Sequence, residues 1–133
     1  MAAWAAIAMK TVNVTSSEFE GVIQKGGITF VDFWAAWCGP CKAFAPVFEN
    51  ASSRFPEINF VKVDTDAESE LAAAANITSI PTLMAFRDGI LVFRQPGALS
   101  SSSFEELIQA VKNLDMESIK AEIAAEAAKD NAK

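Results

Sequence analysis

The chain has 133 residues, of which 51% are hydrophobic and 21% charged, and this composition predicts a globular domain with short appendages and not a disordered chain. Its 17 acidic residues against 11 lysines and arginines give a net charge of −6, so it lacks the basic surface that nucleic-acid binding needs. It has no histidine and 2 cysteines, which excludes imidazole catalysis and most zinc sites built by one chain.

An apolar stretch, Met1 to Met9, comes first in the sequence and is followed by Lys10. A secretory signal carries its positive charges before the apolar stretch, so this order predicts no export signal. No apolar run reaches the length of about 20 residues that a membrane-spanning helix needs. We therefore expect residues 1–9 to be an apolar N-terminal extension of a cytoplasmic protein that does not bind membranes.

Hydrophobic periodicity and turn residues then predict alternating strands and helices. Two helix starts are indicated by capping-box spacings, Thr15 with Glu18 and Ser103 with Glu106. The expected elements are a strand at 12–14, a helix at 16–25, a strand at 28–34, a helix through 44–51, a strand at 58–63, a helix at 68–75, strands at 81–86 and 90–93, and a helix from 103 to 114.

The order of these elements, β-α-β-α-β-α-β-β-α, predicts an α/β fold. It combines parallel crossovers with a final hairpin, whose turn is Asp88-Gly89. Such an order gives a central mixed β-sheet with helices on both faces. The strand at 28–34 is apolar almost throughout, which predicts a central strand buried on both faces.

Residues 115–133 differ in composition, with 5 acidic and 3 basic residues among many alanines. Asp115 is placed to cap a new helix, in which Met116, Ile119, Ile123 and Ala127 fall on one stripe. We expect an acidic, alanine-rich helical C-terminal extension. Two arrangements remain open, a helix docked on the domain and a solvated helix without chemistry, and the narrow stripe favours the second.

Cys38 and Cys41 lie at the boundary between a predicted strand and a predicted helix. A disulfide across two intervening residues removes little chain entropy. Two thiols do not complete a metal site either, although a cluster shared between two chains remains an alternative. A cysteine pair with this spacing and placement is typical of redox chemistry.

The helix N-terminus predicts different roles for the two thiols. Cys38, near the N-cap, is close to free backbone N–H groups that stabilise a thiolate, so we predict that it is the nucleophile. Cys41, inside the first turn, is predicted to be the shielded resolving thiol. Pro40 suits the first turn because it lacks an N–H, and Gly39 permits close approach of the backbone.

Asp32 is the one charged residue in the apolar strand at 28–34. We interpret it as a buried acid with a raised pKa that takes and returns the proton of Cys41. Lys62, on the next core strand, is the expected partner for its charge. Two alternatives are a carboxylate at a strand end and a lysine that extends into solvent.

The run from Val31 to Lys42 resembles the active-site segment of the thioredoxin family. Its Gly39-Pro40 dipeptide is similar to that of reducing members, whereas disulfide isomerases and periplasmic oxidases carry other dipeptides. The segment 43–46 looks like the actinobacterial branch of the cytosolic bacterial members. Further motifs match the family in order within a domain at 10–114: Pro46, Lys62, Ile80-Pro81-Thr82, Asp88-Gly89 and Gly97-Ala98.

The resemblance implies a thioredoxin fold and a protein-disulfide reductase with a redox-active Cys38–Cys41 disulfide, no bound cofactor and no metal. It implies NADPH-dependent thioredoxin reductase and disulfide-containing client proteins as partners, and we expect a monomer. Trp37 is expected to be exposed, and Trp34 to pack in the core. The resemblance also implies a cis bond before Pro81 and a shallow apolar rim for partner proteins, formed by Trp37, Ile80, Pro81, Gly97 and Ala98.

Two other functions remain open. One is a disulfide oxidase or isomerase on the same fold, and the other is a non-catalytic binding or holdase subunit, for which the acidic extension is the only support. Ala36 and Pro96 depart from the family pattern beside the predicted rim, which leaves partner preference open.

Overall fold

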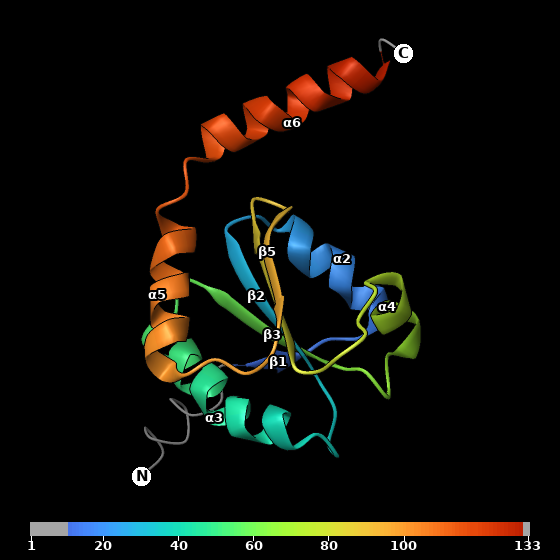
Figure 1. Cartoon of the computed structure of the whole chain (residues 1–133), viewed down its shortest axis with the longest axis vertical. Helices are drawn as coiled ribbons and strands as arrows, with labels where there is room; N and C mark the ends of the chain where they lie inside the picture. The colour runs from blue at the N-terminus through green and yellow to red at the C-terminus, as the bar shows by residue number, and fades with distance from the viewer. Residues whose placement is uncertain (1–10, 132–133) are drawn as a thin grey trace.

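A mixed β-sheet is the centre of the computed structural model, which describes residues 11–131 (Figure 1). Within those residues the sheet has five strands in the order β1-β3-β2-β4-β5. The elements are β1 (Val12–Asn13), α2 (Ser16–Gln24), β2 (Ile28–Trp34), α3 (Gly39–Arg54), β3 (Asn59–Asp64), α4 (Ser69–Ala74), β4 (Thr82–Arg87), β5 (Ile90–Pro96), α5 (Ser101–Lys112) and α6 (Met116–Asn131). The predicted extension at 1–9 lies outside the described residues.

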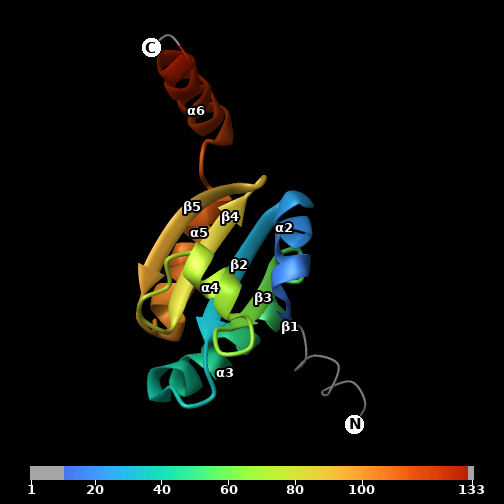
Figure 2. The same cartoon turned by 90° about the vertical axis from the view of Figure 1, so that its right-hand side faces the viewer.

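The pairing of the strands confirms the predicted mixed sheet. β3 pairs in parallel with β1 and β2, while β4 runs antiparallel to β2 and to β5. Figure 1 shows α5 on one side of the sheet and α2 and α4 on the other, and Figure 2 shows the same layers after a quarter turn. The predicted coverage of both sheet faces is therefore also confirmed.

Side chains of β2 alternate between two hydrophobic clusters. Phe30 packs with side chains of α3 and α5, and its ring lies edge-on to Phe104 with centroids 5.3 Å apart. Val31 and Phe33 pack on the opposite face in the cluster that includes Ile23 of α2. The strand is therefore buried on both faces, and it holds Asp32 on the same side as Phe30.

The residues that were predicted to begin and end the first helix do so in the structure. The backbone N–H of Thr15 donates to Glu18 Oε1 at 2.9 Å, which closes the capping box at the start of α2. Gly26 and Gly27 follow the helix with φ of +85° and +69°, a conformation that favours glycine and ends α2.

The predicted start of the last domain helix was wrong. α5 begins after Ser100, whose Oγ accepts the backbone N–H of Ser103 at 3.1 Å, so Ser103 is inside the first turn and is not the cap. Four serines in a row offer several equivalent caps, and the extended backbone of Ser100 (φ −70°, ψ 163°) selects the first of them. β5 also continues to Pro96, beyond its predicted end, because Thr82 and Pro96 are paired.

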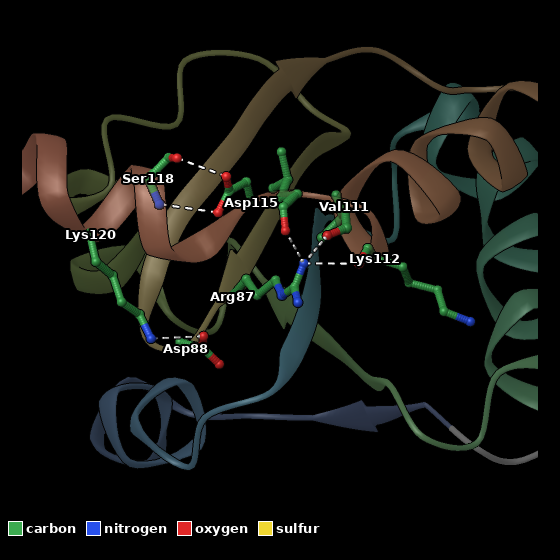
Figure 3. A network of polar contacts seen from close by, with 8 residues as sticks. Arg87, Asp88, Val111, Lys112, Asp115, Ser118 and Lys120 are labelled. Carbon is green, nitrogen blue, oxygen red and sulfur yellow. Dashed lines mark hydrogen bonds and ion pairs between the residues drawn. The ribbon is translucent and has the colours of Figure 1, made fainter.

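A partly buried arginine holds the end of α5 against the β4–β5 hairpin (Figure 3). One guanidinium nitrogen of Arg87, Nη1, donates to the carbonyl oxygens of Val111, Lys112 and Leu114 at 2.8, 3.0 and 3.1 Å. Val111 and Lys112 belong to the last turn of α5, where the helix itself does not satisfy all of its carbonyl groups, and Leu114 follows the helix. Arg87 therefore caps α5 from a neighbouring strand.

The extension is a helix that leaves the domain after its first turn. Asp115 caps α6, because its Oδ1 accepts the backbone N–H of Ser118 at 3.2 Å, and Lys120 forms an ion pair of 3.1 Å with Asp88. Met116 is buried, but Ile123 is 47% exposed, and the helix projects away from the sheet in both views. The start of α6 thus contacts the domain, and residues 121–130 of the helix are exposed.

Replacing Arg87 with methionine is expected to lower the free energy of unfolding by about 2 kcal/mol, because three charge-assisted hydrogen bonds are lost together. Urea denaturation of both proteins gives the difference. Arg54→Met is the matched control, since Arg54 forms an exposed ion pair with Glu105 and its loss should cost less than about 1 kcal/mol. Equal losses for the two variants would show that the Arg87 cap does not stabilise the fold.

Candidate redox site

The two cysteines lie where the loop after β2 leads into α3, and Figure 1 shows this junction at one end of the sheet. Cys38 is the N-cap residue of α3, with an extended backbone (φ −86°, ψ 113°), and Pro40 follows it in the first turn. The Sγ of Cys38 accepts the backbone N–H of Cys41 at 3.1 Å. The predicted placement of both thiols at a helix N-terminus is therefore observed.

Cys38 and Cys41 are joined by a disulfide, with their Cα atoms 5.2 Å apart. Both residues are buried, at 4% and 3% exposure, in a small cluster with Ala35. We expected only Cys41 to be shielded, so exposure does not distinguish the two sulfurs in the oxidised state. The surroundings of the two sulfurs do distinguish them, because the Sγ of Cys38, and not that of Cys41, accepts a backbone N–H at the start of α3.

Asp32 is buried in the middle of β2 with 1% of its surface exposed. Within residues 11–131 neither of its carboxylate oxygens has a hydrogen-bond partner. Burial disfavours the charged form and raises the pKa of Asp32 to about 7, while the positive charge of Lys62 opposes that rise. The carboxyl group is therefore poised to gain or lose a proton near neutral pH, as the sequence predicted.

Lys62 lies directly opposite Asp32 in the pairing of β2 with β3. Its Nζ is 5.0 Å from the ring centroid of Trp34, a distance that allows a cation–π interaction. Trp34 is half-buried, so the prediction that it packs in the core is only partly confirmed. Both side chains line a hollow of about 280 Å³ beside Cys41.

Three loops form the surface around the disulfide. The Ile80–Pro81 bond is cis, and the carbonyl oxygen of Ile80 lies 3.6 Å from the Sγ of Cys38. Gly97, with φ of +103°, donates its N–H to the carbonyl of Pro81 at 2.8 Å. The ring of Pro81 is fully buried, so the exposed part of the predicted rim consists of Trp37, Gly97 and Ala98, with Ile80 half-buried.

Trp37 has a partner that sequence reasoning missed. Its side chain is 70% exposed, as predicted, and its indole Nε1 donates to Asp66 Oδ2 at 3.0 Å. Asp66 follows β3, and the carboxyl ends of the parallel strands β2 and β3 meet at the same edge of the sheet. That adjacency was available from the predicted topology and would have suggested the contact.

Residues 11–131 contain no cluster of three or more side chains suited to hold a metal ion. None of the helices in that range combines the length and the apolar character needed to cross a membrane.

A helix-capping disulfide beside a cis-proline and a buried acid defines a site for thiol–disulfide exchange. The model of the thioredoxin family matches residues 10–127, which includes the domain and runs into α6. The chain therefore belongs to the thioredoxin family.

Individual relatives agree with that assignment. A thioredoxin-family protein of Streptomyces coelicolor is 44% identical over 86% of this chain and 85% of its own length. The thioredoxin of Staphylococcus saprophyticus is 41% identical over 76% of this chain and 97% of its own length. The structure of a Plasmodium falciparum thioredoxin superposes with a TM-score of 0.69 at 37% identity, over 75% of this chain and 97% of that one.

Members of this family are thiol–disulfide oxidoreductases that use a redox-active disulfide and no prosthetic group. This chain is accordingly a thiol–disulfide reductase, and its reactive group is the Cys38–Cys41 pair. Family proteins are reduced by thioredoxin reductase and act on disulfide-containing clients.

Proposed function

We propose that the protein reduces client disulfides through a mixed-disulfide intermediate in which Cys38 is the attacking thiol. The Cys38 thiolate attacks one client sulfur, the client S–S bond breaks, and the second client sulfur leaves as a thiolate. The Cys41 thiolate then attacks the Sγ of Cys38, releasing the first client sulfur and forming the Cys38–Cys41 disulfide. Two electrons pass to the client. The backbone N–H that Cys38 Sγ accepts supports this assignment, because it stabilises negative charge on that sulfur.

Asp32 is the proposed acceptor and donor for the proton of Cys41. It lies buried on the face of β2 that turns toward α3, and its pKa of about 7 permits proton exchange at neutral pH. Lys62 has a positioning role in this proposal, because its charge opposes the effect of burial on Asp32 while Trp34 holds its ammonium group.

The proposed electron donor is an NADPH-dependent thioredoxin reductase, and the proposed clients are proteins with accessible disulfides. The proposed docking surface lies around the disulfide and consists of Trp37, Ile80, Pro81, Gly97 and Ala98. Its most exposed apolar side chain is that of Trp37. We further propose a monomer that works in the cytoplasm, where thiols are kept reduced, and that binds neither nucleic acid nor membranes. The net charge of −6 supports the exclusion of nucleic acid.

The reduction potential of the Cys38–Cys41 couple tests the reducing direction. We expect a value at or below the cytosolic glutathione potential of roughly −220 to −260 mV. Equilibration in buffers of defined thiol ratio, followed by tryptophan fluorescence, measures it, because Trp34 packs against the cysteine cluster. A potential near −120 mV, at the oxidising end of the same scale, would show instead that the protein donates disulfides.

The chain with both cysteines replaced by serine is the control for this titration. Its fluorescence should not change with the thiol ratio. The variant contains no cysteine that could be oxidised or reduced, so neither Trp4 nor the other tryptophans can report such a change. The same variant tests the alternative of a non-catalytic binding subunit, which would keep its cellular role without the two thiols.

A further inference from the structure

Arg94 of β5 contacts the segment that connects α4 to β4. It lies opposite Met84 in the pairing of β5 with β4, and its side chain is exposed. Its two terminal nitrogens bind two successive carbonyl oxygens, since Nη1 donates to Ala75 and Nη2 donates to Asn76 at 2.6 Å. Two bonds from one planar guanidinium group fix the orientation of their acceptors as well as their distance. Arg94 therefore ties the end of α4 to β5 at two points.

The end of α4 needs such an external partner. The helix has 6 residues, too few to be stable without contacts to the rest of the domain. The N–H groups of Asn76 and Ile77 bond to carbonyl oxygens inside the helix at 3.0 and 2.9 Å, and Asn76 adopts φ of +56°. These bonds do not satisfy the carbonyl oxygens of Ala75 and Asn76, which follow the last helical residue. Arg94 supplies the donors for both.

The segment that Arg94 holds ends at the redox site. The carbonyl oxygen of Ile80 lies 3.6 Å from the Sγ of Cys38, and the carbonyl oxygen of the next residue accepts the N–H of Gly97 at 2.8 Å. Arg94 is in β5, and Gly97 directly follows that strand. One short stretch of chain thus holds both the beginning and the end of residues 75–81.

We propose that Arg94 is a positioning residue for client binding, because it keeps the loop before Pro81 ordered while no client is bound. This inference rests on the proposed docking surface, of which Ile80 is a part. A client that meets an ordered loop does not bear the entropic cost of fixing it, so loss of the Arg94 bonds should weaken docking. The exchange step uses Cys38 and Cys41, which Arg94 does not contact, and its rate in the bound state should stay the same.

Arg94→Met tests the proposal in the reduced full chain, with insulin as a protein disulfide. The rate of oxidation of the chain is followed by tryptophan fluorescence at increasing insulin concentration. We expect the half-saturating concentration to rise about tenfold and the maximal rate to stay within about twofold of the parent value. A small aromatic disulfide needs no docking surface and should react equally fast with both proteins. An unchanged half-saturating concentration, or slower reaction with both substrates, would overturn the proposal.

Two further variants separate the two-point contact from the effect of charge. Arg54→Met removes the same side chain at the last residue of α3, remote from the disulfide, and should leave both reactions unchanged. Arg94→Lys keeps the positive charge but loses the planar pair of nitrogens, so it should remain impaired with insulin. Full recovery in Arg94→Lys would assign the effect to charge and overturn the proposal.

Hydrogen exchange locates the effect within the chain. In Arg94→Met we expect the backbone amide of Ile77 to exchange at least about tenfold faster, whereas the amides of Phe30 and Val31 in the buried strand should keep their protection. Unchanged exchange at Ile77 would overturn the role of Arg94 alone. A parent chain that fails to reduce insulin would instead overturn the proposed function, and this inference with it.

Discussion

Replacing Cys38 with serine is expected to abolish disulfide reduction, whereas replacing Cys41 with serine is expected to trap the client. Without Cys38 no attacking thiolate is held at the helix N-terminus, and the rate should fall by at least about a thousandfold. Without Cys41 the first exchange still occurs, but no thiol is placed to release the mixed disulfide. Release of an aromatic thiol from a small disulfide substrate measures the first effect, and mass spectrometry of the protein measures the second.

Lys42→Ala is a suitable control, since Lys42 adjoins Cys41 but its side chain is exposed, and it should form no lasting adduct. Two outcomes would contradict the assigned roles. A stable adduct on Cys41 in the Cys38→Ser protein would reverse nucleophile and resolving thiol. Equal residual activity in both single variants would mean that the two sulfurs are interchangeable.

Replacing Asp32 with asparagine is expected to raise the free energy of unfolding at neutral and alkaline pH, but not at acidic pH. The folded pKa of about 7 lies above the ordinary value of 3.8, so the folded protein binds the Asp32 proton more tightly than the unfolded chain does. The stability of the parent protein therefore falls as the pH rises from about 4 to about 7, and this contribution is constant above that range. At pH 8 the variant should be more stable by on the order of 4 kcal/mol, which corresponds to this difference in pKa.

Denaturation of both proteins in urea at pH 4 and at pH 8 checks this expectation. The gain should be close to zero at pH 4, where the carboxyl group is protonated in the folded state and only partly ionised in the unfolded one. A gain of the same size at both pH values would show that repacking, and not ionisation, explains the difference. Asp66→Asn is the control, because Asp66 is exposed and its change should give no pH-dependent gain of this size.

The same Asp32 variant is expected to slow client release roughly a hundredfold at neutral pH, which is the usual size of a general acid–base contribution. The inflection near pH 7 in the rate of resolution should disappear with the carboxyl group. Stopped-flow fluorescence of the mixed disulfide follows this step. A rate profile that keeps its inflection in Asp32→Asn would assign the titration to another group.

Features that depend on residues close in sequence were predictable. The capping box at Thr15, the glycines that end α2 and the placement of Cys38 at a helix start all follow from short-range patterns. Asp32 was also recognisable, because a charge inside an apolar strand implies burial with an altered pKa. The order of strands and helices sufficed for the mixed sheet, since handed crossovers leave few topologies.

Features that depend on partners distant in the chain were not predictable in the same way. The choice of Ser100 over Ser103 as cap depends on the extended backbone at Ser100, which no pattern within the run of four serines indicates. The bond from Trp37 to Asp66 joins two loops that no local pattern connects, and only the parallel pairing of β2 with β3 brings the two loops to the same edge. The hydrogen bond from the N–H of Gly97 to the carbonyl of Pro81 likewise joins residues that are distant in the sequence.

Because α6 projects from the domain, its C-terminal end is a suitable point for attaching the protein to a surface or to another molecule. The Arg87 cap and the ion pair of Lys120 hold the start of α6 at the hairpin end of the sheet, where Arg87 pairs with the first residue of β2, whereas Cys38 follows the last residue of β2. A fusion partner, a fluorophore or an electrode surface joined to the last turn of α6 is therefore separated from Cys38 by the length of the sheet. The helix serves as a built-in spacer, so the immobilised protein should keep its reactive end facing solution.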